Sequence, residues 1–260
     1  MIPQPHAFGG RNGVHALNDG VYWCHHGGIV VVLSMNSGRY TTLDPLASMV
    51  WIRACEGDAL DRIVEHVRSE RLPTPDVAEL EATISELIEA FCEKGLLRAM
   101  PATGGPPEPT TTLGQAAPRS TTASPRAKAP RVPSVIECCV LLACARIALR
   151  VLRLRKVLAY LWRTRREISC VLNERWLQAL ARNLAIAQAI SPIHTACLEQ
   201  SLTAWWCLNR AGAEAHLRLG AQPFPFNAHA WVEHRGTPVV DDPEHLREFR
   251  AFPPIDFARL

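Results

Sequence analysis

The chain has 260 residues and a formal net charge of +3, and 48% of its residues are hydrophobic, so it can bury the core of one large or two small domains. The N-terminal residues lack the apolar stretch of a secretory signal, and the longest apolar run of interest, residues 138–145, is far shorter than the roughly 20 residues of a membrane span. The nine cysteines form no CxxC pair, which favours a reducing cytoplasm over a disulfide framework. We therefore expect a cytoplasmic protein without a membrane span.

Charge and composition divide the chain into blocks. Residues 1–100 hold 8 Lys/Arg and 13 Asp/Glu, residues 101–186 hold 14 and 4, and residues 187–260 hold 6 and 8. Residues 101–133 are rich in Pro, Thr, Ala and Ser and nearly lack large apolar side chains, so they cannot build a core. The sequence predicts a first domain over residues 1–100, a linker over 101–133 and a second domain over 134–260.

The first domain is predicted to contain three strands followed by three helices. The residues Asn36, Ser37 and Gly38 are typical of a turn between two strands, and Asp44 followed by Pro45 is typical of a helix N-terminus. The predicted strands cover residues 20–25, 29–33 and 39–43, and the predicted helices cover 45–56, 58–67 and 76–94.

The second domain is predicted to begin with helices and to end with short strands. The helical patterns cover residues 135–162, 173–190 and 196–211, the last of them capped by Thr195. The strand candidates cover residues 215–219, 228–233 and 237–241, and a Pro-rich, irregular tail follows.

Three residues of the second domain could form a nucleophile–base–acid set. Cys197 falls in the first turn of its predicted helix, where free backbone N–H groups and the helix dipole favour a thiolate. His229 lies on a strand and could serve as the base, and an acidic pair on the next strand could orient it. Alone, Cys197 would be interpreted as a small buried residue and His229 as a structural histidine.

The register of the predicted hairpin decides which acid faces His229. A two-residue loop at Arg235 and Gly236 would place Asp242 opposite His229, but it requires a positive φ at Arg235, which arginine disfavours. A three-residue loop that starts at His234 places Gly236 at the left-handed position and Asp241 opposite His229. The sequence therefore favours Asp241, with Asp242 as the alternative.

The sequence around these residues resembles the transglutaminase-like cysteine peptidase of lasso peptide biosynthesis, the B protein. The matching stretches are TACLEQSL, RAGAEAHLRLG and AHAW followed by VEHRGTPVVDD, and the resemblance covers residues 135–255. It implies a papain/transglutaminase-like domain with a catalytic triad of Cys197, His229 and Asp241. It also implies a precursor peptide as substrate and an ATP-dependent lasso cyclase as partner.

Residues 14–100 resemble the small winged-helix-like domain that recognises precursors in ribosomal peptide modification, similar to the pyrroloquinoline quinone peptide chaperone. The matching stretches are SGRYTTLDPLASMVWIRACEG and CEKGLL. Such domains bind a leader peptide as an added strand beside the third strand, flanked by the third helix. The residues then expected to contact the leader are Arg39, Tyr40, Thr41, Thr42, Leu43, Ile84 and Ile88.

Together these features predict a two-domain α+β cysteine peptidase that cuts a leader from its core peptide. An acyltransferase or transglutaminase-type transfer with the same triad is the first alternative. A winged-helix DNA-binding regulator is the second, although the net charge of −5 over residues 1–100 argues against nucleic acid. The sequence has no phosphate-binding GxxxxGK[ST] motif and no second ligand pair for the Cys-His-His stretch at residues 24–26, so we expect no cofactor and no metal.

Overall fold

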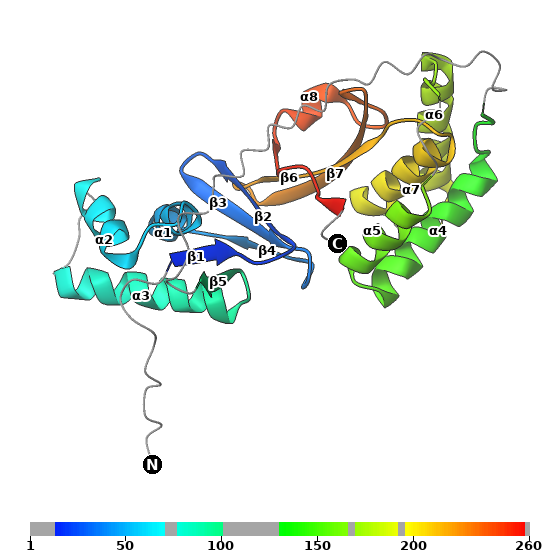
Figure 1. Cartoon of the computed structure of the whole chain (residues 1–260). Coiled ribbons are helices and arrows are strands. Elements are labelled where there is room, and N and C mark those ends of the chain that lie inside the picture. Colours follow the sequence, from blue (N-terminus) through cyan, green and yellow to red (C-terminus); the bar gives the residue numbers. More distant parts are fainter. Residues whose placement is uncertain (1–13, 71–76, 101–129, 166–169, 192–195, 258–260) are drawn as a thin grey trace. The chain divides into compact units, whose positions relative to one another are not determined.

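The computed structural model describes residues 14–70, 77–100, 130–165, 170–191 and 196–257. Residue contacts divide the chain into two compact units, and most of the helices and strands are labelled in Figure 1. One unit takes the described residues of Met1–Val21, Gly27–Val30 and Thr41–Ala117, and the other takes those of Tyr22–His26, Val31–Tyr40 and Pro118–Leu260. Residues 101–129 of the predicted linker lie outside the described residues, so the domain boundaries at 100 and 134 stay a prediction.

The N-terminal residues form the predicted three strands and three helices. The strands are β2 (Val21–His26), β3 (Ile29–Ser34) and β4 (Arg39–Thr42), in the sheet order β2-β3-β4. The helices are α1 (Pro45–Cys55), α2 (Leu60–Ser69) and α3 (Val77–Glu93). The sheet therefore has β4 at one of its edges.

Local chemistry explains where α1 begins and what holds α3. The Asp44 carboxylate accepts a hydrogen bond from the Ala47 N–H at 2.8 Å. Pro45 occupies the first turn, where the backbone N–H that proline lacks would have no partner within the helix. The buried stripe of α3 includes Ile84, Ile88 and Phe91, and the Phe91 ring meets the Trp51 ring of α1 edge-on at 5.1 Å.

A second, two-stranded sheet in this part of the chain was not predicted. Its strands β1 (Val14–Leu17) and β5 (Leu97–Met100) pair antiparallel, with Val14 opposite Met100 and Leu17 opposite Leu97. Each strand has only four residues and no alternating pattern of apolar and polar side chains. Short segments that pair across such a sequence separation leave no local signal, and this explains why the pattern missed them.

The second unit combines four longer helices with a four-stranded antiparallel sheet, and a short helix joins the last two strands. The helices are α4 (Val135–Val151), α5 (Leu154–Arg163), α6 (Glu174–Ile190), α7 (Cys197–Arg210) and the short α8 (Pro243–Leu246). The strands are β6 (His216–Gln222), β7 (Asn227–His234), β8 (Thr237–Pro238) and β9 (Arg250–Ala251), in the order β8-β7-β6-β9.

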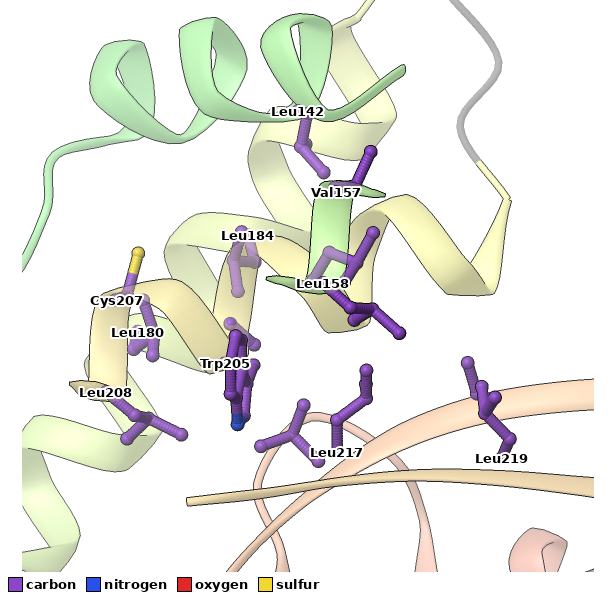
Figure 2. Packing of buried hydrophobic residues seen from close by; sticks show 14 of the residues in the cluster. Leu142, Val157, Leu158, Leu180, Leu184, Trp205, Cys207, Leu208, Leu217 and Leu219 are labelled. Carbon is purple, nitrogen blue, oxygen red and sulfur yellow. The ribbon is translucent and has the colours of Figure 1, made fainter. Parts of the chain in front are cut away.

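The helices of this unit pack on the sheet through a continuous apolar core. Figure 2 shows Leu142 of α4, Leu158 of α5 and Leu217 of β6 directed into the same interior, with Trp205 of α7 among them. The Trp205 indole N–H donates to the carbonyl of Ala215 at 3.0 Å, which satisfies the one polar atom of this buried ring. The core thereby fixes α7, the helix that carries Cys197.

Three predictions for this unit were wrong in detail. The single helix predicted for 135–162 is broken, because Leu152 adopts an extended conformation (ψ 151°) between α4 and α5. The strand predicted for 237–241 ends at Pro238, and the tail predicted to be irregular contains α8 and β9. Breaks inside a continuous apolar pattern depend on tertiary packing, so periodicity alone cannot place them.

The end of the predicted linker is hydrogen-bonded to side chains of α6. The carbonyl of Pro130 accepts from the Trp176 indole, and the carbonyl of Pro133 accepts from the Asn183 amide, both at 2.8 Å. Ser134 then caps α4 in a reciprocal pair with Glu137. Residues 130–133 are therefore ordered against the helices that follow them.

Candidate active site

Cys197 occupies the first position of α7. The helix has Ala196 at its N-cap, and the Glu199 carboxylate accepts from the Ala196 N–H at 2.9 Å, which satisfies one of the free donors of the helix end. Thr195, predicted as the cap, lies outside the described residues. The predicted placement of Cys197 in the first turn is confirmed, and a thiolate there meets the positive end of the helix dipole.

Helix α7 lies against β7, and one buried hydrogen bond joins the helix to the strand. The Ser201 hydroxyl donates to the carbonyl of Ala230 at 2.7 Å. One turn earlier on the helix, the Cys197 sulfur lies 3.9 Å from the carbonyl oxygen of Ala228. Cys197 is therefore next to the strand that carries His229 between these two alanines.

The structure brings His229 and Asp241 into direct contact. The Nε2 of His229 lies 2.7 Å from Oδ1 of Asp241, and the two side chains are only 15% and 16% exposed. This bond uses Nε2, so Nδ1 is the imidazole nitrogen left for the Cys197 thiol. The three residues thus form a connected Cys–His–Asp arrangement built from α7, β7 and the segment after β8.

The predicted hairpin register was wrong, although it selected the same acid. His234 pairs with Thr237, so the loop has two residues, and both Arg235 (φ 52°) and Gly236 (φ 79°) have positive φ. The ladder continues to a bond from the Val239 N–H to the Val232 carbonyl at 3.0 Å. The buried side chains of β7 fix this register, and their packing outweighs the modest strain at one arginine.

Extended regularly, the observed register would place Asp242 opposite His229. The strand instead ends at Pro238, and the chain bends away, so that Asp241 reaches the imidazole. Asp242 has a separate role, because its carboxylate caps α8 by accepting from the Glu244 N–H at 3.0 Å. A bend beyond a strand end is not encoded in an alternating pattern of side chains, so the sequence predicted Asp241 through a register that the hairpin does not adopt.

The surroundings shift the pKa values of both members of the Cys–His pair. Burial raises the pKa of Cys197, but hydrogen bonding to His229 and to the backbone N–H of Ala230 outweighs it, and the net pKa is lowered. The hydrogen bond that His229 donates to Asp241, followed by the one it makes with Cys197, raises the pKa of His229 to about 9. Both shifts favour a thiolate–imidazolium pair at neutral pH.

Trp231 supports His229 from the same face of β7. Its ring lies nearly parallel to the imidazole (15°) at 6.3 Å, and its indole N–H donates to Glu233, which also accepts from Arg218 at 3.0 Å. A Cβ added at Gly220 would lie 2.8 Å from the Trp231 ring. Glycine at position 220 therefore makes room for the ring beside the strand pair.

Two residues that contact His229 were not predicted from the sequence. The Phe249 ring lies 5.1 Å and the His245 ring 5.6 Å from the imidazole. The one available signal was their spacing, since His245 and Phe249 are four residues apart just after the helix-start pair Asp242 and Pro243.

The residues predicted to bind a leader are arranged as a sheet edge and a buried helix stripe. Residues Arg39–Thr42 form the edge strand β4, and the N–H of Leu43 donates to the carbonyl of Val30 at 2.9 Å. Ile84 is 0% and Ile88 6% exposed, so both side chains belong to the buried face of α3. Contact of any of these residues with a leader stays a prediction.

Within the described residues, no group of three or more His, Cys, Asp or Glu side chains could hold a metal ion. In the same part of the chain, no helix combines the length and apolar character that crossing a membrane requires.

Two parts of the chain match families of known proteins. Residues 138–253 match the transglutaminase-like superfamily, and residues 30–97 match coenzyme PQQ synthesis protein D. The chain therefore has a region similar to coenzyme PQQ synthesis protein D followed by a transglutaminase-like region, in the predicted order. These matches, together with the mixture of helices and antiparallel strands, confirm the predicted α+β class.

Two solved structures are similar to part of the chain. One is TbiB1 in complex with the TbiA(beta) leader peptide, at 27% identity and a TM-score of 0.31, with 33% of this chain and 98% of that chain covered. The other is lasso peptide synthetase B1 complexed with the leader peptide, at 22% identity and a TM-score of 0.30, with 34% and 99% covered. No curated protein matches the chain.

Proposed function

We propose that this protein is a cysteine endopeptidase that cleaves the leader from a ribosomally made lasso peptide precursor. The observation that carries the proposal is the contact of His229 with Asp241 at 2.7 Å beside the first-turn cysteine of α7. A thiol, a base and an orienting acid in this arrangement are the parts that nucleophilic acyl chemistry requires.

The reaction starts from the Cys197 thiolate, which attacks the carbonyl carbon of the last leader residue. Free backbone N–H groups at the start of α7 stabilise the oxyanion that forms. The His229 imidazolium donates its proton to the departing amine, so the core peptide leaves with a free N-terminus and the leader remains as a thioester on Cys197. His229 then takes a proton from water, and the hydroxide releases the leader as a carboxylic acid. Asp241 keeps the imidazole oriented and stabilises its charged form.

The leader is proposed to bind as an extra strand along β4. Edge strands carry backbone groups that can pair with an added strand, and β4 is an edge of the sheet β2-β3-β4. The match of residues 30–97 to coenzyme PQQ synthesis protein D supports this role. The free amine of the released core is the group that an ATP-dependent lasso cyclase would join into a ring, so such a cyclase is the proposed partner.

Substitution of the nucleophile and of its base tests the proposal. We expect Cys197→Ala and His229→Ala each to abolish precursor cleavage in a mass-spectrometric assay while labelled leader still binds with nearly wild-type affinity. Cys207→Ala is the matched control, because Cys207 lies on the same helix but is buried away from His229, and we expect it to retain cleavage. Full cleavage by Cys197→Ala would refute the assignment. Product mass also separates hydrolysis from transfer to an amine, because only hydrolysis adds the mass of water.

A further inference from the structure

The segment that begins at Asp241 connects the two edge strands of the sheet of the second unit. It leaves edge strand β8, forms α8 and returns as β9 beside β6, so it runs from one edge of the order β8-β7-β6-β9 to the other. Its end is fixed by pairing of Gly220 with Ala251 and by a 2.8 Å bond from the Phe252 N–H to the Leu219 carbonyl. We call residues 241–249 the crossover segment.

Three side chains of the crossover segment meet at one imidazole. Asp241 binds Nε2 of His229, while the rings of Phe249 and His245 lie 5.1 Å and 5.6 Å from it. The Phe249 ring is tilted by 31° to the imidazole, and the His245 ring meets it at 77°, edge to face. The two rings also contact each other at 5.4 Å, so they act as one block.

A turn after α8 brings the two rings together. Asp242 caps α8, and the chain then turns through bonds from the Glu248 N–H to the His245 carbonyl and from the Phe249 N–H to the Leu246 carbonyl. Phe249 is buried, whereas His245 is exposed. Phe249 therefore fills the space beside the imidazole, and His245 covers that contact on its solvent side.

We propose that Phe249 and His245 are positioning residues that hold the His229 imidazole in the one orientation that reaches both Asp241 and Cys197. An imidazole can rotate about its bond to Cβ, and a rotation that kept one partner would lose the other. The hydrogen bond to Asp241 alone does not prevent this, because carboxylates accept over a broad range of angles. Rings packed on the imidazole restrict the rotation, and they exclude water from the pair. The inference rests on the proposed use of His229 as the base for Cys197.

The charge state of Cys197 provides a readout that needs no peptide substrate. Among the described residues, the titratable groups that face His229 are Cys197 from α7, Asp241 after β8 and His245 from α8. If the imidazolium loses its orientation, it stabilises the thiolate less and the pKa of Cys197 rises. Alkylation by iodoacetamide is a reaction of the thiolate, so its rate against pH reports this change directly.

The experiment compares full-length variants by the alkylation rate of Cys197, resolved by mass spectrometry. Trypsin releases residues 183–210 as one peptide that also contains Cys207, and burial raises the pKa of Cys207 to about 12, so Cys207 serves as an internal unreactive reference. We expect Phe249→Leu to slow Cys197 labelling at neutral pH by between about twofold and about tenfold and to move the inflection upward. Phe249→Tyr and His245→Phe keep the rings and should stay near wild type, whereas His245→Ala should show a smaller shift than Phe249→Leu.

A matched control separates positioning from general loosening. Phe252→Leu removes another buried ring of the same tail, whose ring contact is with Tyr40 instead of His229, and we expect its profile to match wild type. Equal profiles for Phe249→Leu and wild type would overturn the inference while leaving the peptidase proposal intact. An ordinary thiol profile for Cys197 in the wild type would instead refute the Cys–His pair itself. A shifted profile in a protein that cuts no precursor would uphold positioning and refute the peptidase proposal.

Discussion

Cys197 differs from the buried cysteines of this chain in the direction of its pKa shift. Burial is the first cause of the raised pKa values of Cys24, Cys138 and Cys207, which reach about 11, 11 and 12. Cys197 is also partly buried, yet its pKa is lowered, because His229 and backbone N–H groups stabilise the thiolate. The difference comes from position at the start of α7 and beside β7, and not from the residue type.

The pH dependence of cleavage should reflect this pair. The proposed cleavage requires the Cys197 thiolate, so kcat/KM should fall as pH drops below the lowered pKa of Cys197. It also requires the imidazolium as the proton donor, so kcat/KM should fall again as pH rises through about 9, the pKa of His229. Initial rates on the precursor between pH 5 and pH 10 would measure both limbs, and an alkaline limb near the ordinary histidine value would contradict the described geometry.

The two neighbouring aspartates should respond very differently to the loss of charge. We expect Asp241→Asn to lower kcat by as much as about 10⁴-fold, because the orienting carboxylate of His229 is lost. Asp242→Asn should leave kcat within about twofold, because asparagine caps a helix about as well as aspartate and Asp242 serves α8.

Single-turnover cleavage of the precursor by each variant measures the contrast. Circular dichroism of both proteins serves as the control for folding. A crippled Asp242→Asn variant beside an active Asp241→Asn variant would mean that the strand register, and not the bend after Pro238, sets the triad.

At the scale of elements, the sequence predicted most of what the local pattern encodes. The strands that became β2, β3 and β4, and the starts of α1 and α6, follow from turn residues, caps and apolar spacing. The break at Leu152, the β1–β5 pair and the bend before Asp241 depend on contacts between distant segments, so no local rule could place them. The contact among Cys197, His229 and Asp241 was therefore predictable by residue type, whereas the rings of His245 and Phe249 around His229 required the tertiary structure.

The edge strand β4 allows a sharp test of leader binding. The Leu43 N–H donates to Val30 in the neighbouring strand, and N–H groups alternate in direction along a strand, so Thr41 donates inward and Thr42 donates toward the open edge. Thr42→Pro therefore removes a donor that only an added strand would use, and we expect leader affinity to fall about 5- to 10-fold with the fold preserved.

Thr41→Pro is the matched variant, since it removes a bond within the sheet and should lower thermal stability first. Fluorescence anisotropy of labelled leader measures binding by both variants, and thermal melts monitored by circular dichroism measure their folding. Unchanged leader affinity in a folded Thr42→Pro protein would remove β4 from the binding role.

At the scale of the whole molecule, recognition and chemistry are assigned to residues far apart in the sequence. The contact-defined units do not follow the chain order, since the unit that holds Cys197 and His229 also takes Tyr22–His26 and Val31–Tyr40. Removal of the first 100 residues would thus remove part of that unit's own core, which includes Val31, Leu33 and Met35. Experiments that separate leader binding from cleavage therefore require the full chain.

Competition by free leader separates the two roles in the intact protein. If the leader binds at β4 and the cut occurs at Cys197, a leader peptide without a core should raise the KM for the precursor and leave kcat unchanged. A short peptide that spans only the cleavage site should have a far higher KM than the precursor, because it lacks the β4 contacts, and free leader should leave its cleavage unaffected. Initial rates with both substrates at increasing leader concentration measure these effects. Equal inhibition of both substrates would mean that the leader occupies the catalytic site itself, and the assignment of leader recognition to β4 would then be wrong.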